Sequence, residues 1–226
     1  MFKNMKIIGT SHISKDSFKK IKNSIKTFKP DVVAVELDKK RYHSLIFQKE
    51  SKLSFLDVRR VGLTGFLFLI IGKYVQKKLG SIVGIDPGSD MKLAIELCKE
   101  NNLSLELIDR DIEVTLRRFS QKFSFKEKLN LLKDLLFFPF SKKIIPFNIS
   151  KIPKKGLIRK ILEEIKTRYP NIYSVLIEER NKYMAKKLFK ILRDNKNLKI
   201  LCVIGAGHEE GLHQELKNLY YSNLSF

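Results

Sequence analysis

Cysteine, proline and tryptophan are scarce in this sequence of 226 residues, which has two cysteines, six prolines and no tryptophan. Cys98 and Cys202 are too few for a disulfide framework in a chain of this length, and they fall in a predicted helix and a predicted strand. A buried free thiol behaves as a small apolar side chain. With 43% hydrophobic residues the chain can bury a sizeable core, so we expect a globular fold in a reducing compartment.

Long apolar runs are also missing. The longest, residues 61–72, has about half of the ~20 residues that a membrane-spanning helix needs. It predicts a buried helix or one that faces a partner, for which a second copy of the chain (a homodimer) is one candidate. The apolar segment at residues 5–9 is too short for a signal peptide. We therefore expect a cytoplasmic or membrane-associated protein, with no transmembrane helix in this chain.

Acidic residues are outnumbered, with 24 Asp and Glu against 45 Lys and Arg, which gives a formal net charge of +21. A charge of this size favours an anionic membrane surface or nucleic acid as a partner. The lysines are spread over most predicted helices, and no RNP, zinc-finger or helix-turn-helix signature is present. We therefore expect no specific nucleic-acid recognition. An anionic membrane surface stays a candidate partner, and a solvated lysine-rich surface is the alternative.

Two stretches, residues 5–12 and 199–208, combine a short apolar run with a Gly-x-x-His turn. A fully apolar run that ends at glycine is typical of a parallel strand covered on both faces. Further strands are predicted at residues 32–36, 81–85 and 103–108, and amphipathic helices alternate with all five. The pattern predicts an α/β fold with a central, mostly parallel sheet and helices on both faces. We expect one domain over residues 1–226, with residues 124–168 as a helical insertion or lid.

The five predicted strands are followed by polar side chains: His12, Glu36, Asp86, Asp109 and His208. In open α/β sheets, ligands bind beyond the carboxyl ends of the strands. Two imidazoles and a carboxylate at those ends form a plausible ligand set for a catalytic divalent metal, which would activate a water molecule and polarise a carbonyl group.

Each of these side chains also has a structural interpretation. Either histidine alone could be a hydrogen-bonded core residue, and Glu36 could be an ion-pair partner of Arg41 or Arg180. Asp109 and Asp111 could cap the helix that follows them. Glu178 and Glu179 could lie on a solvated helix face. His43 and His213 fall on predicted helix surfaces, and no role is assigned to them.

Six blocks of the sequence, in order, resemble the TraB/PrgY pheromone-shutdown family, a branch of the superfamily that includes the TIKI Wnt-inactivating proteases. Two positions depart from the family pattern: Asp90 stands where the family usually has Glu, and Asn181 stands where it has Asp. The matching blocks are Gly9–Ser14, Pro30–Tyr42, Asp86–Met91, Leu107–Arg118, Glu179–Ala185 and Val203–His208.

The resemblance implies a TIKI/TraB-like core of the erythromycin esterase/ChaN-like type, and metal-dependent hydrolysis of a peptide, such as a signalling peptide. Its cofactor would be a divalent transition metal (Mn, Co or Zn) held by His12, Glu36 and His208. The alternative is a non-catalytic module that binds or sequesters a peptide or small ligand in the same crevice. The residues that match catalytic or supporting positions are Glu36, Arg41, Asp109, Arg110, Arg118, Glu179 and Arg180.

Overall fold

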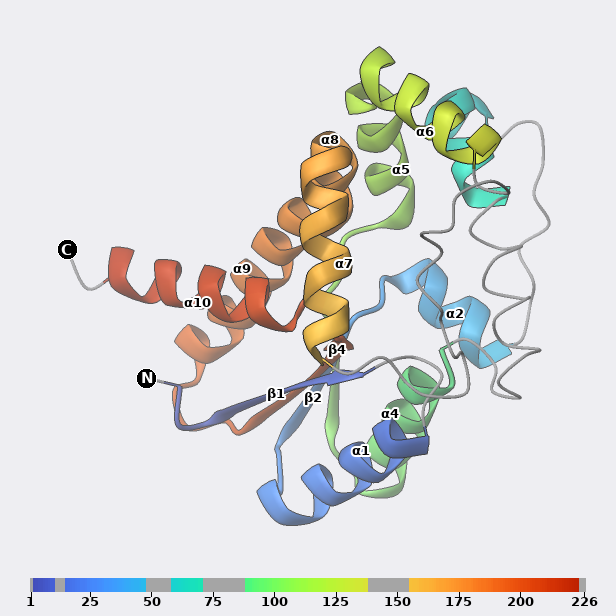
Figure 1. Cartoon of the computed structure of the whole chain (residues 1–226). Helices are drawn as coiled ribbons and strands as arrows, with labels where there is room; N and C mark the ends of the chain where they lie inside the picture. Colours follow the sequence, from blue (N-terminus) through green and yellow to red (C-terminus); the bar gives the residue numbers. More distant parts are fainter. Residues whose placement is uncertain (1, 11–14, 48–57, 71–87, 138–154, 224–226) are drawn as a thin grey trace.

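A computed structural model describes residues 2–10, 15–47, 58–70, 88–137 and 155–223 of the chain. Four strands form one parallel sheet in the order β1-β4-β2-β3 (Figure 1). The last strand along the chain therefore lies between the first two. The predicted strand at 81–85, Asp86 and the turn that contains His12 lie outside the described residues. The strands are β1 (Met5–Thr10), β2 (Val32–Val35), β3 (Ser104–Leu107) and β4 (Ile200–Gly205).

The carboxyl ends of all four strands meet at one edge of the sheet, because every pairing is parallel. Thr10 pairs with Gly205, and Val35 pairs with both Val203 and Leu107. Backbone hydrogen bonds continue past the strand ends: the Glu36 N–H donates to the Val203 carbonyl at 3.1 Å. The polar residues that follow β2, β3 and β4 are thereby brought to the same edge.

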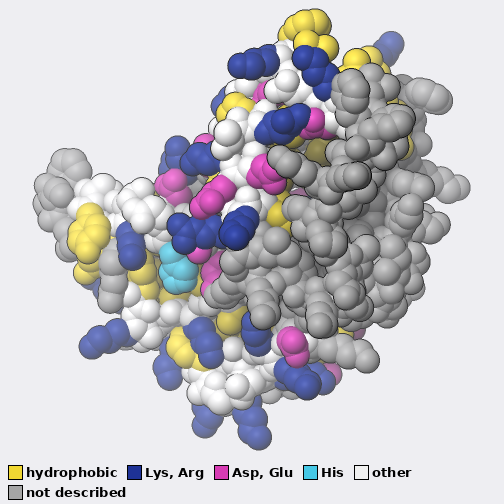
Figure 2. All heavy atoms as spheres, viewed as in Figure 1, with side chains coloured by type: hydrophobic (Ala, Val, Ile, Leu, Met, Phe, Trp, Pro, Cys, Tyr) yellow, Lys and Arg dark blue, Asp and Glu magenta, His cyan; other side chains and the backbone are white. Residues whose placement is uncertain are grey.

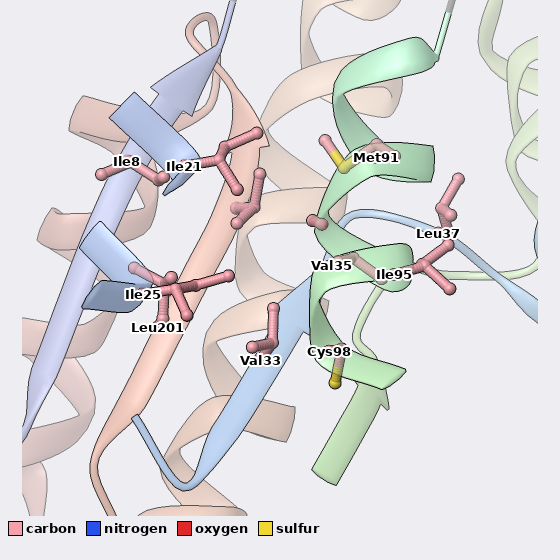
Figure 3. Close-up of a cluster of buried hydrophobic side chains, with 12 residues drawn as sticks. Ile8, Ile21, Ile25, Val33, Val35, Leu37, Met91, Ile95, Cys98 and Leu201 are labelled. Atoms are coloured by element: carbon pink, nitrogen blue, oxygen red, sulfur yellow. The ribbon is translucent and has the colours of Figure 1, made fainter. Parts of the chain in front are cut away.

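Helices cover both faces of the sheet (Figure 1). Successive side chains of a strand point to opposite faces, and the buried strand β4 divides its residues between two cores. Helices α1 (Lys15–Phe28) and α4 (Ser89–Glu100) pack on Leu201 and Val203 on one face (Figure 3). Helices α9 (Glu179–Asp194) and α10 (Glu209–Ser222) pack on the other face. The predicted α/β fold class is confirmed.

The other helices lie beyond the carboxyl edge of the sheet or beside it (Figure 1). Residues 58–70 are helical within the predicted apolar run; Val61 and Phe66 are buried there, whereas Leu63 and Leu67 are exposed. No helix within the described ranges is both long and apolar enough to cross a membrane. The remaining elements are α2 (Lys39–Phe47), α5 (Ile112–Lys122), α6 (Phe125–Phe137), α7 (Lys155–Arg168), α8 (Pro170–Tyr173) and the π-helical turn η2 (Ser174–Glu178).

Two of these helices, α6 and α7, occupy the described part of the predicted insertion, and residues 138–154 lie outside it. The buried carboxylate of Glu127 ties α6 to α8: it accepts hydrogen bonds from the Ser124 hydroxyl at 2.9 Å and from the Asn171 backbone N–H at 2.8 Å. Burial alone would raise the pKa of Glu127, but the hydrogen bonds from Asn171 and Ser124 outweigh it and lower the pKa.

Candidate active site

Glu36 lies directly after β2, and its side chain is almost entirely buried at 7% exposure. One carboxylate oxygen, Oε2, accepts the Gly205 backbone N–H at 2.6 Å, which ties the end of β2 to the end of β4. The other oxygen, Oε1, accepts a hydrogen bond from Nη2 of Arg180 and lies 3.3 Å from Nε2 of His208. Glu36 and His208, which are 172 positions apart in the sequence, are therefore neighbours at the sheet edge.

His208 is buried in the turn between β4 and α10, and its backbone N–H donates to the Gly205 carbonyl at 2.9 Å. Its Nδ1 lies 2.8 Å from Oδ1 of Asn181. Because an amide oxygen only accepts, this contact places a proton on Nδ1, so a neutral ring carries a lone pair on Nε2. That lone pair would face a carboxylate oxygen of Glu36. The Glu36–His208 contact is favourable when a proton or another cation neutralises it.

Asp109 follows β3 and is the most enclosed carboxylate of the edge, with no exposed side-chain surface. It binds two guanidinium groups: Nη2 of Arg180 at 2.6 Å and Nη2 of Arg41. Burial alone would raise the pKa of Asp109, but the charges of Arg180 and Arg41 outweigh it and lower the pKa. Arg41 also binds Asp38 at 2.6 Å, and its side chain is 32% exposed against 14% for Arg180.

The charges of this cluster do not balance. Three buried carboxylates, those of Glu36, Asp38 and Asp109, face two guanidinium groups, those of Arg41 and Arg180. Buried charges are costly unless they are paired. The cluster therefore favours one further positive charge, in the form of a proton on His208 or a bound cation.

A second ion-pair cluster lies next to the first, because Glu179 precedes Arg180 on α9. The Glu179 carboxylate binds Arg110 at 2.9 Å, Arg118 at 2.7 Å and Lys122 at 2.8 Å. The hydrogen bond from Arg118 is the main reason that the pKa of Glu179 is lowered, against the effect of its burial. Nη2 of Arg110 is buried without an acceptor within the described part of the chain. This cluster holds α5 against the start of α9.

Further polar residues reach the edge from β1 and α4. The Thr10 hydroxyl binds the fully buried Asp90 and also lies 3.1 Å from the Ile204 carbonyl. Glu209, directly after His208, lies so close to Gly9 that a Cβ at Gly9 would be 2.4 Å from its Oε2. Thr10, Glu209 and the His208 partner Asn181 were not among the predicted site residues. The departure of Asn181 from the family pattern was the sequence signal that could have drawn attention to it.

The described residues can be compared with the predicted metal ligands. No group of three or more His, Cys, Asp and Glu side chains is placed to hold a metal ion in the ranges that the structure describes, and His12 lies outside them. The other two predicted ligands, Glu36 and His208, do lie together. Ligands about 2.0–2.1 Å from a tetrahedral ion are about 3.3 Å apart, which matches the 3.3 Å between Oε1 and Nε2. The hydrogen bond that orients Nδ1 is also typical of a metal-bound histidine.

The structural alternatives apply in part. Glu36 is indeed an ion-pair partner of Arg180, and Asp111 caps α5 by accepting the Glu113 N–H at 2.7 Å. Asp109 does not cap that helix but joins the ion-pair cluster. The structure brings together Glu36, Arg41, Asp109, Arg180 and His208, and it places Arg110, Arg118 and Glu179 in the adjoining cluster.

A carboxylate, an imidazole and two guanidinium groups at the carboxyl edge of a parallel sheet define an α/β protein whose polar site lies where such sheets bind ligands. The chain belongs to the TraB/PrgY/gumN family, whose model matches residues 3–220.

Curated relatives come from archaea and mammals. The uncharacterized protein MJ1365 of Methanocaldococcus jannaschii is 40% identical over 223 residues, which cover 96% of this chain and 54% of that protein. The TraB domain-containing proteins of Mus musculus and Homo sapiens are 27% and 26% identical, over 92% of this chain and 61% of theirs. The chain thus spans about half to three fifths of the length of these relatives.

Proposed function

We propose that this protein is a metal-dependent hydrolase that acts on peptides. The observation that carries the proposal is the pair formed by Glu36 Oε1 and His208 Nε2, 3.3 Å apart at the carboxyl edge of the sheet. Two sequence-distant groups of the predicted ligand set converge there, and the buried cluster around them favours one more positive charge. The choice of a peptide as substrate rests on the resemblance to the TIKI branch.

Glu36 and His208, together with His12, would hold the metal, which when bound would polarise the scissile carbonyl and acidify a water molecule. The residues of the chain have distinct tasks around it. Glu36 is placed to accept the proton of the attacking water at Oε1. Arg180 and the Gly205 N–H hold that carboxylate in position. Asn181 fixes the His208 ring so that Nε2 faces Glu36.

Arg41 is the guanidinium of the cluster best placed to meet a substrate, because about a third of its side chain is exposed. It could bind a carboxylate of the substrate or stabilise the oxyanion that forms when the peptide bond is attacked. Asp109, which has no exposed side-chain surface, acts by orienting Arg41 and Arg180. Glu179, Arg110 and Arg118 act one step further away, by holding α5 to α9.

The proposal is tested with purified protein and a mixed peptide library, with Mn²⁺, Co²⁺ and Zn²⁺ supplied one at a time and products read by mass spectrometry. We expect cleavage with at least one metal and a loss of about 10²-fold or more in Glu36→Gln. His208→Ala should also lower the metal content of the purified protein. The matched controls are Glu106→Gln on the exposed side of β3 and His43→Ala on the surface of α2, which should keep full turnover.

Two results separate the proposal from its alternative. Peptides that are retained by the protein but keep their mass with all three metals would indicate a binding or sequestering module. Equal turnover in Glu36→Gln and in the wild type would show that any cleavage arises elsewhere. Circular dichroism of each variant establishes that loss of turnover is not loss of fold.

A further inference from the structure

A cavity of about 320 Å³ lies between α7, the α8–η2 segment and the beginning of α10. This volume falls within the ~300–1,000 Å³ of small-ligand pockets. Asn181 and Gly207 form part of its wall. Because Asn181 binds the His208 ring at 2.8 Å and Gly207 precedes His208 in the chain, the cavity adjoins the candidate active site. It is therefore placed to hold a group close to the bond that is cleaved.

One part of the cavity wall is apolar. Side chains of α7 and η2 supply most of this surface, and Gly207 adds none of its own: a Cβ there would be 3.7 Å from Leu162. An apolar wall of this kind suits an aliphatic chain but not a strongly hydrated group. Its members are Ile158, Leu162, Tyr173 and Ile177.

The charged side chains of the cavity are acidic in excess. Each of its two cations already has a carboxylate partner: Arg159 binds Glu163 at 3.1 Å, and Lys166 binds Glu178 at 3.3 Å. The lining therefore has one negative charge more than positive, although the whole chain has a net charge of +21. Figure 2 shows carboxylates among the basic side chains in the region of α7 and α10. The carboxylates of the lining are Glu163, Glu209 and Glu210.

We propose that this cavity is a substrate subsite that receives a lysine or arginine side chain of a bound peptide. Such side chains bury an aliphatic stem against apolar surface and keep the charged end in a polar environment. The stem would lie on Leu162 and Ile177, and the cationic end would face the carboxylates at the beginning of α10. The inference rests on the proposed function, because it names the class of peptide that the same site takes.

The test measures binding of capped pentapeptides that differ only at the central residue, in buffer with EDTA so that neither metal nor turnover is involved. The central residue is lysine, norleucine or glutamate, and a norleucine peptide with a free amino terminus separates the side-chain cation from the α-amino group. We expect the lysine peptide to bind at least tenfold more tightly than either capped competitor, with the ratio falling as salt rises. The amide NMR signals of Gly207 and Gly211 should shift on titration.

Glu210→Gln should reduce the preference for lysine to threefold or less, whereas Glu215→Gln, on the same helix but outside the cavity, should leave it unchanged. Both positions lie near the surface of α10. Equal affinity for lysine and norleucine, absence of binding at millimolar peptide, or a preference only for the free amino terminus would overturn the inference. A lysine preference without any cleavage would retain the subsite and refute hydrolysis instead.

Discussion

Arg180 connects three separate parts of the chain through one side chain. Its guanidinium group binds Glu36 after β2, Asp109 after β3 and the Leu176 carbonyl of the π-helical turn at 3.2 Å. A planar fork with five N–H donors is needed for so many acceptors, and lysine does not provide it. The charges of Glu36 and Asp109 raise the pKa of Arg180 even though burial opposes them.

Replacement of Arg180 is expected to be costly for the fold. Arg180→Met leaves the buried carboxylates of Glu36 and Asp109 without their shared partner, which should lower the free energy of unfolding by about 3–5 kcal/mol. Urea denaturation at neutral pH measures this. Arg193→Met, near the other end of the same helix, is the control: Arg193 is 66% exposed and pairs with its neighbour Asp194, so its replacement should stay within about 0.5 kcal/mol. Equal losses in the two variants would contradict the role of Arg180.

At the scale of single residues, the sequence predicts which groups reach the sheet edge but not all of their partners. Asp109 and Asp111 are equivalent helix caps by position, yet only Asp111 caps α5. The difference depends on the direction of each side chain relative to the end of β3, which the spacing does not reveal. Arg180 was foreseen as one of two ion-pair partners of Glu36, whereas the pairing of Asn181 with His208 follows from the packing of α9 on α10.

At the scale of elements, the strand and helix positions follow closely from hydrophobic periodicity. The predicted helix over residues 170–194 differs in one respect: it contains the π-helical turn η2, where the Glu179 N–H donates to the Ser174 carbonyl five residues back. Such a turn adds a residue without changing composition, so a period of 3.6 does not predict it. Glu179, Arg180 and Asn181, immediately after it, reach three different groups of the site.

The packing of α9 on α10 depends on Gly211. A Cβ at this position would lie 2.1 Å from Nδ2 of Asn181. In most helices a change from glycine to alanine adds about 0.5–1 kcal/mol of stability. Here we expect the opposite sign, because Asn181 must move and His208 then loses its hydrogen-bond partner.

Gly211→Ala should therefore lower both the unfolding midpoint and, in an active protein, the turnover. Thermal denaturation and the peptide assay measure these two effects. Lys217→Ala, at an exposed position of the same helix, is the matched control and should change neither by much. A Gly211→Ala variant more stable than the wild type would show that the contact with Asn181 is not tight.

At the scale of the whole molecule, stability should depend on acid. Asp109, Glu127 and Glu179 all have lowered pKa values in the folded protein. A carboxylate of this kind stabilises the fold above its unfolded pKa of about 4 and loses that contribution as the pH falls through the folded value. Protonation also adds to a net charge that is already +21, which increases self-repulsion.

Glu179→Gln tests this dependence. The variant should be less stable than the wild type at pH 7, and its free energy of unfolding should fall less steeply between pH 5 and 3, because one carboxylate with a lowered pKa is gone. Urea denaturation at a series of pH values gives both quantities. Glu164→Gln, at an exposed position of α7, makes the same change in charge and should retain the wild-type slope. Identical slopes in all three proteins would contradict the expectation.

The sheet order is the feature of the whole molecule that the sequence did not predict, because periodicity identifies strands without stating their neighbours. The meeting of the two ends of the chain was expected from the paired Gly-x-x-His turns, and the pairing of β1 with β4 agrees with it. The position of β4 between β1 and β2 is a matter of long-range packing.

That position has a consequence for how the protein is made. The central strand is synthesised last, so β1 emerges from the ribosome some 195 residues before the partner that separates it from β2. At about 5–20 residues per second, the delay is roughly 10–40 s. Throughout it, two apolar strands have open edges and nothing to join them. A nascent chain of this topology depends on chaperones, or on slow collapse, until its last quarter has been translated.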